Sequence, residues 1–166
     1  MAKDASAPAV AGRPAMTAGY GISADPSGTL PWEWAEDQLT RGRNYWICTV
    51  RPDGRPHAMP VWGLWLDGAV VFSTDPGSVK GRNLAAEPRV VVHLESGDDV
   101  VIVEGTVEIR QGADVPDGFA DAYENKYALR PEPGPGQVVY VLRPAVVLAW
   151  REKDFPTSAT RWTFPR

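Results

Sequence analysis

The sequence predicts a mainly β fold, a small barrel of six or seven antiparallel strands with few helices. Short runs rich in valine and aromatic residues recur between residues 45 and 150. The pairs Asp53-Gly54 and Asp67-Gly68, which favour hairpin turns, separate the first three runs. Closing such a sheet removes its exposed edges, so a barrel is the economical arrangement. A barrel this narrow is filled by its own side chains, and a large ligand would lie outside it, between two subunits.

The first half of the chain contains a tail, a helix and three strands. Residues 1–28 are mostly Ala, Gly, Pro and Ser, and we expect a flexible N-terminal tail followed by one domain over residues 29–166. Acidic residues near the start and Gly42 as the stop predict a helix that begins near residue 31. Strands are predicted over residues 45–50, 56–66 and 69–74.

The second half alternates strands with two helical pieces. A short helix follows Ser78 and ends before Pro88, and residues 117–129 have helical spacing with Asp117 as a possible cap. Gly105 marks a bulge or a close approach of two backbones. Strands are predicted over residues 90–95, 100–110, 138–150 with an interruption at Pro144, and 160–164 as a short edge strand.

Composition excludes several classes of function. The net charge of −4 provides no basic footprint for nucleic acid, and no apolar stretch approaches the length of a membrane span. The single cysteine, Cys48, excludes an internal disulfide and favours a cytoplasmic protein. His57 and His93 belong to no cluster with the spacing of metal ligands. The seven tryptophans are more than the core of such a chain usually needs, and some of them are candidates to wall a flat ligand.

A candidate anion site follows the third predicted strand. There the chain enters a loop of small residues and then a helix with a lysine in its first turn. Free N–H groups and the helix dipole attract a phosphate at such a junction. The side-chain donors are Ser73, Thr74, Ser78 and Lys80. The alternative is a plain helix cap, with Asp75 or Ser78 as the capping residue and Lys80 as a solvated charge.

The order of these pieces resembles the pyridoxamine 5'-phosphate oxidase-like flavin-binding split barrels. The resemblance covers residues 30–164 and depends on an Arg-Pro-Asp-Gly turn at residues 51–54, on Phe72-Ser73-Thr74 and on Val103-Glu104-Gly105. It implies a Greek-key split barrel and a homodimer with two cofactors at its interface. The flavin and deazaflavin oxidoreductases, many of which use coenzyme F420, are the most similar branch, and Thr160-Arg161-Trp162 also resembles that branch.

The resemblance assigns cofactor-binding roles by position. Ser73, Thr74, Ser78 and Lys80 match phosphate-binding positions, and Asn83 lies close to them. The segment Met59-Pro60-Val61-Trp62 matches the strand that runs along the tricyclic ring. The branch-specific residues Arg161 and Trp162 complete the set.

Three departures from the family pattern favour a deazaflavin over FMN. Pyridoxamine phosphate oxidases carry Arg, Lys and Gln, which hold FMN, where this chain has Met59, Leu64 and Val100. We therefore expect a coenzyme F420-dependent oxidoreductase that transfers a hydride between the deazaflavin and a small, apolar organic acceptor. An FMN-dependent reductase or oxidase and a non-enzymatic flavin or haem carrier remain alternatives. No catalytic residue is assigned, since Tyr45, His57 and water are all possible proton donors.

Overall fold

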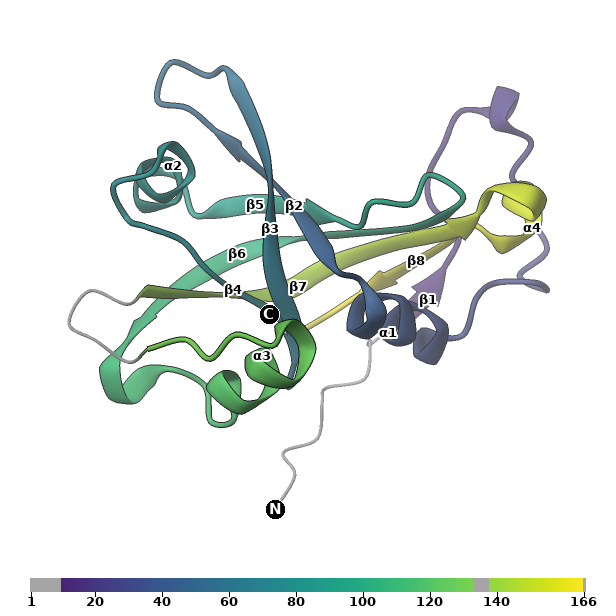
Figure 1. Cartoon of the computed structure of the whole chain (residues 1–166). Coiled ribbons are helices and arrows are strands. Elements are labelled where there is room, and N and C mark those ends of the chain that lie inside the picture. Colours follow the sequence, from purple (N-terminus) through teal and green to yellow (C-terminus); the bar gives the residue numbers. More distant parts are fainter. Residues whose placement is uncertain (1–9, 133–137, 166) are drawn as a thin grey trace.

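The computed structural model describes residues 10–132 and 138–165 and confirms the predicted β-barrel (Figure 1). Six strands close into an antiparallel barrel in the order β7-β4-β3-β2-β5-β6, and β6 pairs back to β7. They are β2 (Asn44–Val50), β3 (Pro56–Leu66), β4 (Ala69–Ser73), β5 (Arg89–His93), β6 (Asp99–Gln111) and β7 (Val138–Arg151). Two further strands, β8 (Thr160–Thr163) and β1 (Val10–Gly12), extend the sheet beyond β7.

The connection between the two halves of the barrel is a crossover. The first three barrel strands form one meander and the last three form another, joined by α2 (Val79–Ala86). After α2 the chain pairs β5 with β2 instead of with the preceding strand β4. This connection makes the barrel a Greek key, as the family resemblance implies, whereas strand order along the sequence had indicated a simple meander.

Strand β3 changes partner halfway along its length. Its residues 56–62 pair with β2 on one edge, and its residues 63–66 pair with β4 on the other. In the described chain no strand covers the second edge of residues 56–62. Pro60, which lacks an N–H donor, is tolerated here because the pleat directs its backbone toward this open edge. The barrel is therefore split beside the N-terminal half of β3.

Strands β6 and β7 form the longest ladder of the barrel, and the predicted irregularity at Gly105 is confirmed. The register shifts between Glu104 and Gly105, opposite Pro144. A Cβ at position 105 would collide with the carbonyl oxygen of Arg143, so only glycine allows this approach. Strand β7 continues through Pro144 because its own extra residue, Ala145, forms the bulge that absorbs the irregularity.

Four short α-helices cover the barrel. Helix α1 (Trp32–Arg41) buries Ala35 and Leu39, and α2 closes the barrel end beside β2. Helix α3 (Phe119–Tyr127) begins after Gly118, whose positive φ makes the turn, so the expected cap by Asp117 is wrong. The remaining elements are α4 (Phe155–Ser158) and the 3-10 turns η1 (Ala18–Tyr20), η2 (Gly112–Asp114) and η3 (Glu152–Asp154).

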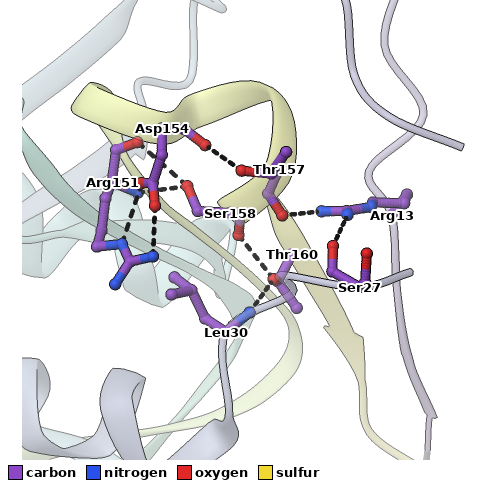
Figure 2. Close-up of polar contacts among 8 residues, drawn as sticks. All are labelled: Arg13, Ser27, Leu30, Arg151, Asp154, Thr157, Ser158 and Thr160. Carbon is purple, nitrogen blue, oxygen red and sulfur yellow. Dashed lines mark hydrogen bonds and ion pairs between the residues drawn. The ribbon is translucent and has the colours of Figure 1, made fainter. Parts of the chain in front are cut away.

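Arg13 fixes the described part of the segment that the composition predicts as a tail. Its guanidinium donates to the carbonyl oxygens of Asp25 and Ser27 on its own segment. It also donates to the carbonyl oxygen of Thr157 at 2.5 Å, near α4 (Figure 2), and to that of Ala159 at 2.9 Å. Within residues 10–28, β1 thus pairs with β8 and later residues contact α4, so contacts of the domain continue across the predicted boundary at residue 28.

Candidate functional site

The loop between β4 and α2 has the predicted strand-to-helix geometry. The side chain of Asp75 accepts from the N–H of Gly77 at 2.6 Å, which forms a tight turn. Ser78 caps α2, since its Oγ accepts from the N–H of Gly81 at 3.1 Å, and it lies 3.3 Å from the hydroxyl of Thr74. The cap interpretation is therefore correct for Ser78, and the first turn of α2 with Lys80 follows directly.

Two cations, Arg51 and Lys80, lie near enough to His57 for their charges to act on it. Burial lowers the pKa of His57, and the nearby charges of Arg51 and Lys80 lower it further. Among the described residues, neither Arg51 nor Lys80 forms an ion pair with a carboxylate. We call Arg51, His57 and Lys80 the cationic group. A positive region without a protein counter-ion attracts an anionic ligand.

Hydrogen bonds among three side chains fix α2 against the β2–β3 hairpin. Asn83 is buried and donates from Nδ2 to the hydroxyl of Thr49 at 2.9 Å. The same hydroxyl lies 3.4 Å from Nδ1 of His57. Asn83 therefore joins α2 to β2 through Thr49, next to His57, and its buried side chain does not line an open surface.

The predicted ring segment lies on the exposed half of β3. Met59 and Trp62 keep 46% and 36% of their surfaces exposed, which is unusual for large apolar side chains within a barrel strand. Because side chains alternate along a strand, Met59 and Val61 share the α2 face with His57, whereas Pro60 and Trp62 point to the other face. The structure thus brings Met59 and Val61 to the side of Ser78 and Lys80.

The backbone of Trp62 faces the open edge of β3. Both backbone groups of the next residue, Gly63, bond the hydroxyl of Tyr127 on the β2 side. Successive residues in a strand direct their N–H and C=O groups to opposite edges. Trp62 therefore directs its N–H to the β4 side of β3, one residue beyond the last paired residue, Gly63.

Other predicted residues have structural roles or lie elsewhere. Ser73 donates to the carbonyl of Val138 at 2.8 Å and thereby joins β4 to β7. Trp162 lies in the core, with 1% of its surface exposed, and packs edge-on against Trp32. Its neighbour Arg161, on β8, is half-buried.

Arg161 and Trp162 lie at the far end of the barrel from the phosphate loop. On β7, Ser73 pairs with Val139 and Arg161 pairs with Leu148, a separation of roughly 30 Å along the strand. Figure 1 shows the same separation, with α2 and α4 at opposite ends. Within one chain these two residues therefore do not join the site of Lys80.

The structure narrows the possible proton donors. Tyr45 is fully buried, and its hydroxyl donates to the carbonyl of Leu39 at 2.5 Å. Burial raises the pKa of Tyr45 well above its usual range. It cannot reach a ligand on the exposed half of β3, whereas His57 lies beside that surface. Throughout residues 10–132 and 138–165, His, Cys, Asp and Glu form no group of three or more suited to hold a metal.

Sequence reasoning missed that Arg51 and His57 lie near Lys80. The hairpin signal at residues 51–54 contained the information, because it pairs Thr49 with His57 and places Arg51 at the turn beside them. It also missed the packing of α3 on β3, where Tyr127 stacks on Trp62 at 4.7 Å between ring centroids. The guanidinium of Arg43 lies 5.3 Å from the Trp62 ring.

A separate apolar hollow lies on the outer face of the barrel. It has a volume of about 490 Å³ and includes Cys48 and Val50 of β2, Val91 of β5, and Val146 of β7. Val50 is 44% exposed. Such a surface on an isolated chain is suited to contact another protein. Within the described residues, no helix is long and apolar enough to cross a bilayer.

Comparisons with known proteins agree with this architecture. A family model described as pyridoxamine 5'-phosphate oxidase matches residues 33–151. A curated pyridoxine/pyridoxamine 5'-phosphate oxidase from Azorhizobium caulinodans is 37% identical over 123 residues, which cover 70% of this chain and 54% of that protein. The chain thus spans about half the length of this relative.

Solved structures show the same fold. A protein named F420 reductase is 29% identical with a TM-score of 0.55, and the match covers 68% of this chain and 94% of the other. A conserved hypothetical protein from Mycobacterium tuberculosis is 24% identical with a TM-score of 0.66, covering 80% of this chain and 90% of the other. The family-model match and the shared split barrel show that this chain belongs to the pyridoxamine 5'-phosphate oxidase-like family of flavin-binding oxidoreductases.

Proposed function

We propose that this protein is a homodimeric oxidoreductase that uses coenzyme F420 and transfers a hydride between the deazaflavin and a small, apolar organic acceptor. The cofactor phosphate lies at the cationic group, and the ring lies along residues 59–62 of β3. The observation that carries the proposal is that Lys80 and Arg51, which form no ion pair within residues 10–132 and 138–165, act on His57 beside an unpaired strand edge.

The residues present fit a phosphorylated tricyclic ligand. The ammonium of Lys80 and the hydroxyls of Thr74 and Ser78 supply donors to a phosphate. The N–H of Trp62 at the open edge supplies a donor to a polar ring edge. Met59 and Val61 supply apolar surface between these two points, as a flat ring requires.

Three positions favour F420 over FMN. Leu64 is 4% exposed and Val100 is 9% exposed, so neither reaches a ligand at the surface. Met59 is exposed and carries no charge. The polar side chains that hold FMN in pyridoxamine phosphate oxidases therefore have no substitutes at these positions. The 29% identical structure named F420 reductase supports the same choice.

A bound deazaflavin supplies a two-electron hydride carrier, and the protein supplies binding and orientation. Lys80 and Arg51 hold the charged end, while the strand edge fixes the ring plane. His57, whose pKa is lowered by burial and by the charges of Arg51 and Lys80, lies on the same face of β3 as Met59 and Val61. A lowered pKa favours the neutral imidazole, which is a poor acid, so a proton for the acceptor comes from water.

A second subunit completes the proposed site. The exposed half of β3 and the outer hollow both present apolar surface that a partner covers. Arg161 lies far from Lys80 in its own chain, so its role in cofactor binding requires that it come from the partner. The core position of Trp162 gives it a supporting role behind Arg161.

Titration of the purified, colourless protein with F420, FMN, haem and inorganic phosphate tests the proposal. Tryptophan quenching reports binding, and the visible spectrum identifies the bound group. We expect the tightest binding for F420, followed by reduction of an apolar acceptor when F420 is supplied in its reduced form. If FMN binds more tightly than F420 and supports turnover, the protein is an FMN-dependent reductase or oxidase. If haem binding produces a Soret band and no cofactor supports turnover, the protein is a non-enzymatic carrier. Either of these results would refute the F420 assignment.

A further inference from the structure

Lys126 on α3 directs its ammonium at β2 and β3 instead of at a carboxylate. Its Nζ donates to the hydroxyl of Tyr45 at 3.2 Å and to the carbonyl of Gly63 at 3.1 Å. Among the described residues it takes part in no ion pair. Burial lowers the pKa of Lys126 to about 8. A half-buried ammonium without a counter-ion destabilises a fold, so a contribution to stability does not account for this lysine.

The neighbouring Tyr127 explains why an additional donor is needed here. The Tyr127 hydroxyl accepts from the N–H of Gly63 at 3.0 Å and lies 2.7 Å from two carbonyl oxygens, those of Gly63 and Arg43. A hydroxyl has one proton and can donate to one of these carbonyls at a time. With Lys126 donating to Gly63, the proton of Tyr127 is free for Arg43, and all the groups are satisfied together.

Gly63 is the residue at which β3 changes partner from β2 to β4. A Cβ there would lie 3.1 Å from the Tyr45 ring and 3.2 Å from the carbonyl oxygen of Val71, so the surroundings fit closely around its backbone. The preceding residue, Trp62, stacks on Tyr127 with an interplanar angle of 5°. Contacts that fix Gly63 therefore also fix Trp62.

The geometry points to Lys126 as a positioning residue: by holding Gly63 together with Tyr127, it sets the orientation of Trp62 and of the open β3 edge along which the cofactor ring lies. The effect on the ring rests on the proposed function, whereas the effect on Trp62 does not. The ammonium itself lies behind the strand and does not contact the cofactor.

Fluorine NMR of protein labelled with 5-fluorotryptophan tests the effect on Trp62 without any cofactor. The chain has seven tryptophans, and Trp62→Phe identifies the resonance of Trp62. We expect Lys126→Met to shift or broaden that resonance and to leave the resonance of the core residue Trp162 in place. Lys126→Arg keeps charge and donors and should restore most of the signal. Lys153→Met, at an exposed lysine on η3, is the matched control.

Kinetics with F420 and with FMN test the effect on the ring. In Lys126→Met we expect kcat/KM to fall roughly tenfold or more, because misplacing the ring lowers the rate, while the Kd of inorganic phosphate stays unchanged. An unchanged Trp62 resonance, or a shifted resonance with wild-type kinetics, overturns the inference. If the wild type binds neither cofactor, the proposed function fails, and the fluorine spectrum still decides the role of Lys126 toward Trp62.

Discussion

Replacing Lys80 by alanine is the most direct test of the anion site. Lys80 has no carboxylate partner among the described residues, so its removal breaks no ion pair. What is lost is one charge-assisted contact to a phosphate, about 1.5–3 kcal/mol. That free energy corresponds to a roughly 10- to 150-fold rise in the Kd of the cofactor. The free energy of unfolding should change by no more than about 0.5 kcal/mol.

The same substitution has a second readout in the protein without cofactor. The charge of Lys80 contributes to the lowered pKa of His57, so Lys80→Ala should raise that pKa. The chain has two histidines, and the ring signals of His93, which stacks on Trp46, serve as an internal reference in an NMR titration. This result depends only on the geometry of the cationic group.

Lys153→Ala is the matched control, since it removes the same charge near α4, at the other end of the barrel. Calorimetry or tryptophan quenching at two salt concentrations measures the affinity of each variant. An unchanged Kd in Lys80→Ala, or equal losses in both variants, would refute the reasoning. A raised Kd with an unchanged pKa of His57 would place the phosphate elsewhere along α2.

The remaining predictions concern the N-terminal segment, the subunit contact and pH. Arg13→Ala and Arg13→Lys should both speed hydrogen exchange in residues 10–28 and lower the free energy of unfolding in urea by about 1–2 kcal/mol. The reason is that one ammonium cannot replace a guanidinium that bonds four carbonyls. A wild-type exchange pattern in Arg13→Lys would contradict this expectation. Val146→Glu places a charge in the outer hollow beside Glu104 and should shift sedimentation equilibrium toward monomer, while Leu129→Glu, at an exposed site outside the hollow, should not. The pKa of Lys126 is about 8 when folded and has an ordinary value of 10.5, so the unfolded chain binds more protons between these values. The free energy of unfolding of the wild type, relative to that of Lys126→Met, should therefore rise from pH 8 to pH 10. If the difference between the two proteins does not change with pH, burial does not lower the pKa of Lys126.

Local signals were sufficient to predict the barrel strands. The turn at Asp67-Gly68 and the β-branched runs predicted β3 at its observed bounds and the neighbouring strands within about two residues. Gly105 was recognised as a close approach because glycine within a strand has few other uses. The crossover at α2 was not visible in the strand order, because pairing between β2 and β5 depends on packing across the barrel.

The candidate site was only partly predictable. The loop residues were found because they are consecutive in sequence, and Lys80 and Ser78 lie where the pattern placed them. Arg161 and Trp162 were grouped with them by family position alone, and the register of β8 on β7 places them at the far end of the chain's own barrel. The contacts of Arg13 were also missed, since no local pattern indicates which distant carbonyls a guanidinium will reach.

Pro60 has a consequence for how this protein avoids aggregation. An uncovered strand edge can nucleate intermolecular sheet growth when molecules collide at high concentration. Pro60 interrupts the row of donors along the open edge of β3, so an incoming strand cannot form a continuous ladder there. A planar guest needs only one or two hydrogen bonds from that edge, and the N–H of Trp62 is enough to provide one. The edge can thus stay accessible to a small molecule while it resists extension by another polypeptide.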